Sequence, residues 1–121
     1  MTDDCIYLVH ILERLDRIID FTRDGEEAFM ADRMRQDAVI RNFEIIGEAS
    51  KQISQQTKLL APHVPWKMIA GFRDLLIHNY QGIVINRVWE TVVHDLPGLE
   101  SSIKALLMIL EAQIERNDSQ P

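Results

Sequence analysis

The chain has few residues that break helices and only one cysteine. Its 121 residues include five glycines and four prolines, which leaves room for long uninterrupted helices. The single cysteine, Cys5, cannot form a disulfide within the chain, and this is typical of a protein kept in a reducing compartment. We interpret Cys5 as a small buried hydrophobic residue of the first helix rather than a redox group.

Long apolar runs and an export signal are also lacking. No apolar run approaches the roughly 20 residues that a membrane-spanning helix needs. The N-terminus reads Met1-Thr2-Asp3-Asp4, which is acidic where a signal peptide needs positive charge. We therefore expect a cytoplasmic protein with no membrane contact.

Positive charge is scarce, and this argues against a protein that coats nucleic acid. The net charge is −6, whereas a broad nucleic-acid-binding surface is basic. Residues 1–60 hold eight Lys/Arg and twelve Asp/Glu, a net of −4, but residues 62–88 hold three Lys/Arg and one Asp, a net of +2. An anion would therefore meet a small focused site, which suits an enzyme acting on RNA better than a protein that sequesters RNA.

The composition and apolar spacing predict one all-α domain. The chain is 46% hydrophobic and 26% charged, and apolar residues recur three and four apart over most of its length. We expect helices over about 3–22, from within 26–32 to about 55, over 65–78, from a cap at Asn86 to a break at Pro97-Gly98, and over 99–116. The domain is expected to span 1–116, residues 56–64 to form a connection, and residues 117–121 a frayed polar tail.

Two residues within these helices carry interpretations of their own. Gly47 interrupts good helix formers at a cost of about 1 kcal/mol relative to alanine, so we expect another helix to approach closely there. His10 is interpreted as a partly buried or surface histidine.

The stretch of residues 73–80 concentrates the residues that suit phosphate chemistry. Arg73 and His78 are five residues apart, which on a regular helix places them about 140° apart around the axis. Either the long arginine wraps partway round the helix, or the site combines side chains from two copies of the chain. Asp74 and His78, four residues apart, share a face.

An arginine and a histidine together suit phosphodiester cleavage. A guanidinium stays charged and offers a fork of donors to phosphate oxygens, and a histidine moves protons near neutral pH. The 2′-hydroxyl of RNA attacks the adjacent phosphate once a base removes its proton. His78 would be that base or the acid for the leaving oxygen, and Arg73 would stabilise the charge on the phosphate. This chemistry requires no cofactor.

Structural interpretations of the same residues stay open, and spacing alone favours them. A cation near a helix C-terminus meets favourable partial charge, Asp74 could pair with His78, and Tyr80 could be a core aromatic. A metal site is not indicated, because the four histidines lie on separate segments without metal-ligand spacing.

The motif and its surroundings resemble a known family. Arg73, His78 and Tyr80 are similar to the Arg-x4-His-x-Tyr motif of HepT-like toxins in the HEPN superfamily of ribonucleases. The similarity extends to residues 36–49, 65–73, 88–91 and 95–97, and so covers nearly the whole domain.

The resemblance implies a fold and an activity. The fold would be an antiparallel HEPN bundle of four to five helices that forms a homodimer, with the motifs of both subunits in one cleft. Arg73 and His78 would be the catalytic pair of a metal-independent endoribonuclease toxin acting on RNA such as tRNA or mRNA. Asp74 and Asn79 would support them.

The resemblance also implies a partner. A small nucleotidyltransferase antitoxin of the MNT type would neutralise the toxin by transferring AMP from ATP onto the motif tyrosine, here Tyr80. Gln81 departs from the aromatic residue common at that place in the family. The alternative is a catalytically silent HEPN module that binds and supports a nucleotidyltransferase.

Overall fold

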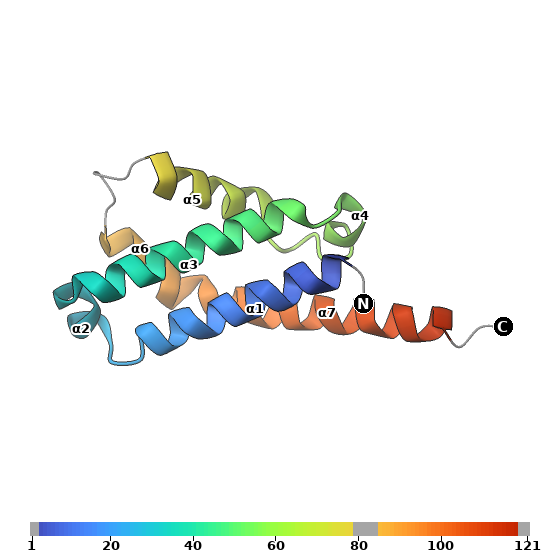
Figure 1. Ribbon diagram of the computed structural model, residues 1–121, viewed down its shortest axis with the longest axis horizontal. Helices are drawn as coiled ribbons and strands as arrows, with labels where there is room; N and C mark the ends of the chain where they lie inside the picture. Colours follow the sequence, from blue (N-terminus) through green and yellow to red (C-terminus); the bar gives the residue numbers. More distant parts are fainter. Residues whose placement is uncertain (1–2, 79–84, 119–121) are drawn as a thin grey trace.

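Every regular element that the structure describes is a helix. The structure, a computed structural model, describes residues 3–78 and 85–118 (Figure 1). The helices in these ranges are α1 (Asp3–Phe21), α2 (Glu26–Ala31), α3 (Arg33–Gln52), α4 (Gln55–Lys58), α5 (Trp66–His78), α6 (Ile85–His94) and α7 (Leu96–Asp118). The predicted all-α class is confirmed. None of the described helices combines the length and the apolar character needed to cross a membrane.

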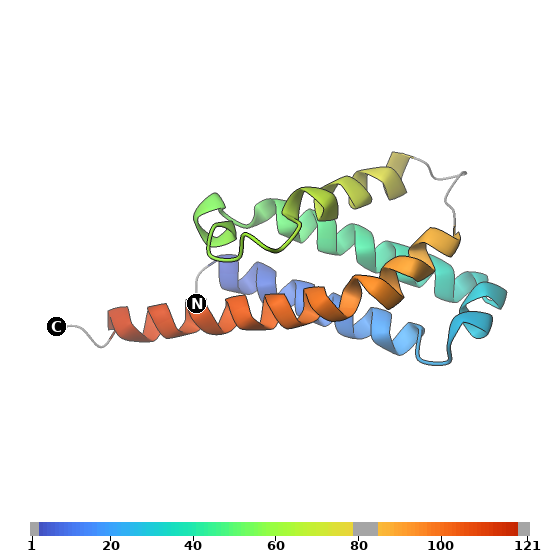
Figure 2. The same ribbon diagram turned by 180° about the vertical axis from the view of Figure 1, so that it is seen from behind.

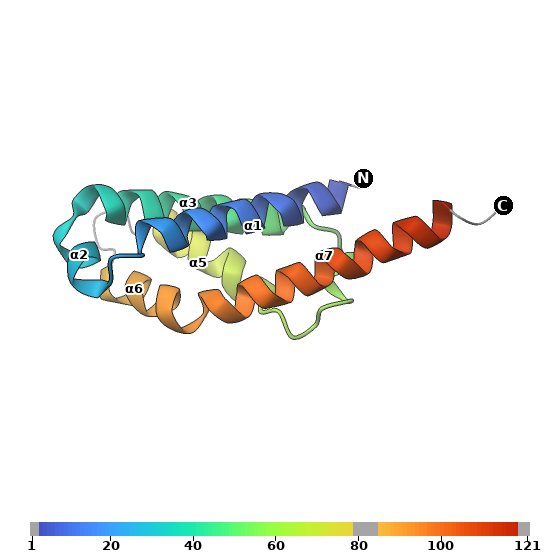
Figure 3. The ribbon, with the colours of Figure 1, turned by 90° about the horizontal axis from the view of Figure 1, so that it is seen from below.

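The bundle is organised around α3. This helix lies between α1 and α5 and makes the two largest interfaces of the fold with them (Figure 1). Helices α6 and α7 form a second layer beneath α1 and α3 (Figure 3), and α7 packs along α1. The C-terminal end of α7 extends beyond the other helices (Figure 2).

The core comes from the apolar stripes of these helices. Cys5 is fully buried, as predicted. The other largest fully buried side chains include Leu8, Ile11, Leu15 and Ile18 of α1, Phe29 of α2, Val39 and Ile46 of α3, Val88 of α6, and Ile103 and Leu106 of α7. Burial of apolar surface along four long helices holds the bundle together.

The second predicted helix is divided, which is a difference from the sequence prediction. Asp32 has extended backbone angles (φ −121°, ψ 104°) and separates α2 from α3. Its carboxylate accepts hydrogen bonds from the backbone N–H groups of Met34 (3.0 Å) and Arg35 (3.3 Å). Asp32 therefore caps α3, because these two groups lack partners within the helix.

The boundaries of the later helices also differ in detail. The stretch predicted as a plain connection contains α4, which Ser54 caps by accepting from the N–H of Thr57 (3.2 Å). Helix α6 begins at Ile85, so Asn86 is not its cap. Pro97 lies in the first turn of α7, where a proline is tolerated, and α7 continues to Asp118.

Candidate functional site

The position of Arg73 depends on a close approach between α3 and α5. Gly47 is the reason this approach is possible: a Cβ atom built on it would lie 2.2 Å from Cβ of Arg73 and 2.8 Å from Cγ. Real Cβ atoms do not approach other carbons this closely. The predicted close approach at Gly47 is therefore confirmed, and the residue that uses it is Arg73.

Carboxylates from two helices hold the guanidinium of Arg73. Its Nη2 lies 2.9 Å from Oε2 of Glu48 on α3, and its Nη1 lies 2.9 Å from Oδ1 of Asp74. The hydrogen bond to Asp74, followed by the charge of Glu48, holds the pKa of Arg73 above its usual value, so the group is always cationic. The Arg73 side chain is 26% exposed, and its buried Nε has no hydrogen-bond partner among the described residues. Solvent can therefore reach part of a cation that is held in place.

Asp74 supports Arg73 and does not pair with His78. Its Oδ1 lies 2.9 Å from Nζ of Lys51 on α3 as well as from Arg73. The hydrogen bond from Lys51, and then that from Arg73, holds the pKa of Asp74 below its usual value. Asp74 therefore links α5 to α3, and the pairing with His78 that the spacing of four allowed is absent.

His78 is the last residue of α5 and is exposed. No hydrogen bond or ion pair holds its ring among residues 3–78 and 85–118. Because it follows Gly71 by seven residues, it lies on nearly the same face as that glycine. Asn79 and Tyr80, the other two motif residues, lie outside the described residues.

Two pockets open on the two sides of α5, and Arg73 lines the smaller one. This pocket of about 220 Å³ is lined by residues of α1, α3 and α5. Helix α1 contributes Tyr7 and His10, and α5 contributes Arg73 and Ile77. The remaining lining residues belong to α3: Arg41, Glu44, Ile45, Glu48, Ala49 and Gln52. His78 is not among the lining residues.

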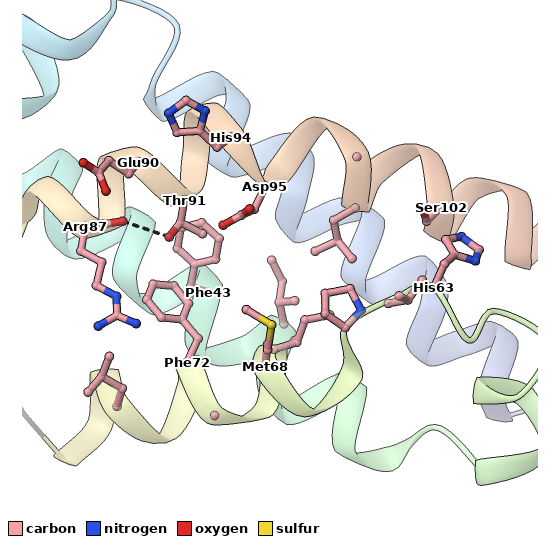
Figure 4. A pocket seen from close by; sticks show the side chains of 18 residues that line it. Phe43, His63, Met68, Phe72, Arg87, Glu90, Thr91, His94, Asp95 and Ser102 are labelled. Atoms are coloured by element: carbon pink, nitrogen blue, oxygen red, sulfur yellow. Dashed lines mark hydrogen bonds between the residues drawn. The ribbon is translucent and has the colours of Figure 1, made fainter.

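The larger pocket, of about 770 Å³, lies between α5 and the α6–α7 pair (Figure 4). Phe43 and Phe72 form part of its wall, with ring centroids 5.3 Å apart. Arg87 extends from α6 toward α5 beside Phe72, whereas His94 points away from α5 (Figure 4). Gly71 and Leu75 line this pocket, so the face of α5 that carries His78 leads into it.

The structure therefore separates the predicted catalytic pair within one chain. Arg73 faces the pocket shared with α1 and α3, and His78 continues the face that lines the other pocket. This agrees with the offset of about 140° expected from their spacing. Across the described residues, no group of three or more His, Cys, Asp or Glu side chains is arranged to hold a metal ion.

His10 and Tyr7 line the pocket of Arg73 although no sequence motif includes them. They come from a helix more than sixty residues before Arg73, and only the packing of α1 and α5 on α3 brings them to one pocket. A weak signal exists in the sequence: Glu44, Glu48 and Gln52 recur every four residues and form a polar stripe on one face of their helix. That stripe is the floor of the pocket.

Comparison with known proteins finds a ribonuclease family whose model matches most of the chain. Residues 11–106 match the family model of HepT-like ribonucleases, described as "Ribonuclease HepT-like". A protein of Thermococcus cleftensis named "Probable ribonuclease HepT" is 45% identical over 101 residues, which cover 83% of this chain and 92% of that protein.

Other relatives are named as RNases. A "Putative RNase" of Methanocaldococcus jannaschii is 38% identical over 112 residues, covering 92% of this chain and 93% of that protein. A longer protein of the same organism, named "Gamma-glutamylcyclotransferase and putative RNase", is 41% identical over 107 residues, and this chain spans 48% of its length. No solved structure matches the chain. The match over residues 11–106 and the relatives of similar length agree, and the chain belongs to the HepT-like ribonuclease family.

Proposed function

We propose that the protein is a metal-independent endoribonuclease that acts as the toxin of a toxin–antitoxin pair, with Arg73 and His78 as its catalytic residues. The observation that carries this proposal is that the chain belongs to a ribonuclease family. Within the chain, Arg73 lines a pocket in which a phosphate could bind. RNA is the substrate, and the reaction needs no cofactor.

The proposed reaction is an attack within the RNA strand. His78 removes the proton of a 2′-hydroxyl, the 2′-oxygen forms a bond to the adjacent phosphorus, and the bond from phosphorus to the 5′-oxygen breaks. The products are a 2′,3′-cyclic phosphate and a 5′-hydroxyl. Arg73 donates hydrogen bonds to the phosphate oxygens, where negative charge builds up in the transition state.

The ion pairs of Arg73 are compatible with binding a phosphate. Glu48 has a side chain that is 55% exposed, so water screens its attraction to Arg73. A phosphate that accepts two hydrogen bonds from the guanidinium can replace Glu48, while Asp74 keeps the side chain oriented. Asp74 and Asn79 have supporting roles in this proposal.

A homodimer would bring the two catalytic groups to one phosphate. Arg73 and His78 leave α5 in different directions. In a dimer, Arg73 of one subunit and His78 of the other could contact the same phosphate while α5 stays a regular helix. The proposal therefore includes a two-fold dimer with a composite cleft.

Regulation would act on Tyr80 through the partner of the toxin. An MNT-type nucleotidyltransferase antitoxin would transfer AMP to the phenolic oxygen of Tyr80, two residues from His78. The added AMP would bring negative charge and bulk to the motif and would compete with the RNA phosphate. The toxin would act on RNA in the cytoplasm.

The test compares growth and RNA integrity in cells that express the wild type, His78→Ala, or the wild type with a nucleotidyltransferase encoded beside it. We expect the wild type alone to arrest growth and cleave RNA, and the other two to do neither. Toxicity and cleavage that survive His78→Ala would contradict the catalytic assignment. An inert wild type would instead favour the silent module that supports a nucleotidyltransferase.

The modification is tested separately by intact-mass measurement after co-expression. The wild type should gain one or more increments of AMP, and Tyr80→Phe should gain none. Increments that persist in Tyr80→Phe would exclude Tyr80 as the acceptor.

A further inference from the structure

The pocket that Arg73 lines contains a histidine that the motif does not include. His10 projects from α1, on the wall opposite α5, and it is exposed. Among the described residues no hydrogen bond or ion pair engages its ring. An unengaged imidazole and a fixed guanidinium therefore share one small pocket.

The proposed reaction leaves a role for a second proton-transfer group. When the 2′-oxygen attacks, one proton must leave the 2′-hydroxyl, and the departing 5′-oxygen must gain one. A single histidine does not serve both atoms at once, because nucleophile and leaving group lie on opposite sides of the phosphorus in an in-line displacement. The motif supplies one histidine, His78.

We propose that His10 is the general acid of the reaction and donates its proton to the 5′-oxygen of the leaving nucleotide while Arg73 holds the phosphate. This inference rests on the proposed ribonuclease function. As the bond between phosphorus and the 5′-oxygen breaks, the proton moves from the His10 imidazolium to that oxygen. After the reaction His78 releases to water the proton it took from the 2′-hydroxyl, and the neutral imidazole of His10 regains one from water, so atoms and charge balance.

The shape of the pocket is compatible with this role. A volume of about 220 Å³ is below the range of roughly 300–1,000 Å³ for drug-sized ligands, so the pocket suits a phosphate with part of its sugar rather than a whole nucleotide. Its floor on α3 carries Glu44 and Glu48, and its cations are Arg41 and Arg73. Two positive and two negative side chains sum to zero formal charge. Arg41 is also paired with Glu44, since its Nη1 lies 3.5 Å from Oε2 of Glu44. A phosphate is therefore attracted by the guanidinium it touches and not by a broad positive field.

The experiment measures cleavage of two RNA substrates that differ in one atom. In one, the scissile phosphate has the ordinary 5′-oxygen, and in the other a sulfur replaces that oxygen. A thiolate leaves without being protonated, so the sulfur substrate does not need a general acid. Removal of a general acid typically slows an ordinary substrate by about 10²- to 10⁴-fold.

We expect His10→Ala to cleave the ordinary substrate about 10²- to 10⁴-fold more slowly than the wild type and the sulfur substrate at nearly the wild-type rate. His78→Ala should be slow on both substrates, because the base is still missing. Glu13→Ala is the control: Glu13 is an exposed residue of α1, three residues after His10, that lines neither pocket, and this variant should behave as the wild type.

Three results would overturn the inference. A His10→Ala variant that is equally slow on both substrates has lost binding or structure, and one that is equally fast on both does not use His10. Rescue of His78→Ala by the sulfur substrate would assign the acid role to His78 and likewise exclude His10. A wild type that cleaves neither substrate would instead contradict the ribonuclease function itself.

Discussion

At the scale of single residues, the site is built on the absence of one side chain. Gly47 lets α5 approach α3 so closely that the Arg73 stem occupies the space of a missing Cβ atom. Glu48, the next residue of α3, then reaches the guanidinium. A glycine is thus retained inside a long helix, where it costs about 1 kcal/mol relative to alanine, because the position of Arg73 requires it.

This account predicts the effect of Gly47→Ala. The new methyl group overlaps the Arg73 side chain, so α5 must shift, and overpacking of this kind destabilises a protein by roughly 1 to 3 kcal/mol. Urea unfolding should show the loss, and RNA cleavage should fall as well because Arg73 moves. The measurement is the free energy of unfolding together with the cleavage rate of the folded variant.

Gly71→Ala is the control for this prediction. Gly71 also lies within a helix, but a Cβ atom built on it meets nothing within 4 Å. This variant should be more stable than the wild type, by up to about 1 kcal/mol, because alanine favours the helix. Equal stability of the two alanine variants would show that the contact at Gly47 has no energetic role.

Sequence reasoning found the importance of Gly47 but not the identity of its neighbour. A helix-breaking residue in a regular helix is visible in the sequence, whereas the side chain of another helix that fills the space is fixed by packing. The same limit explains Asp74. Its spacing from His78 allowed a pair, but Lys51 of α3 reaches it instead. His10 is exposed, in agreement with its interpretation as a partly buried or surface histidine. Nothing local to α1 indicates that α5 lies across the pocket it lines.

At the scale of helices, a single carboxylate ties the start of α1 to α4. Asp4 accepts hydrogen bonds from the hydroxyl groups of Ser54 (2.6 Å) and Thr57 (2.5 Å), and from the backbone N–H of Ser54 (3.0 Å). Burial alone would raise the pKa of Asp4, but these hydrogen bonds together hold it below its usual value. The connection between α3 and α5 is anchored at this point.

The direction of this pKa shift predicts a pH dependence of stability. Because the folded-state pKa of Asp4 lies below the unfolded value of 3.8, its contribution is fully present above that pH and is lost as the pH falls through the folded-state pKa. Asp4→Asn should lower the free energy of unfolding at pH 7 by on the order of 1 kcal/mol. The difference between wild type and variant should shrink toward zero in strong acid. A difference that is independent of pH would contradict the assignment.

The helices themselves were largely predictable, because their apolar stripes repeat at the helical period. The first and third predicted helices match α1 and α5 to within a residue at each end. The prediction missed the division at Asp32, where a polar residue caps the following helix from an extended conformation, and it missed the single turn of α4. The predicted break near Pro97 is present, but it lies at Asp95, and Pro97 falls in the first turn of α7.

At the scale of the whole molecule, α5 lies between two pockets, and the two proposed catalytic residues of the motif face different ones. Arg73 lines one pocket, and the face that carries His78 leads into the other. One chain therefore does not gather the proposed catalytic pair. The proposal of a composite site in a homodimer follows from this separation.

The composite site predicts complementation between two inactive variants. Arg73→Ala and His78→Ala should each be inactive alone. A mixed dimer would hold one site that lacks both groups and one site with both, so equal mixing with free subunit exchange should restore about a quarter of the wild-type rate. Absence of any recovery, with exchange verified by native mass spectrometry, would show that both groups act within one chain.

The measurement that tests the central claim most directly is cleavage of a labelled RNA by the purified protein in the presence of excess EDTA. The account predicts that the wild type produces fragments with a 2′,3′-cyclic phosphate, and that Arg73→Ala and His78→Ala, folded as judged by circular dichroism, lose cleavage by at least about 10²-fold. Cleavage that disappears with EDTA, or that persists unchanged in either variant, would contradict it.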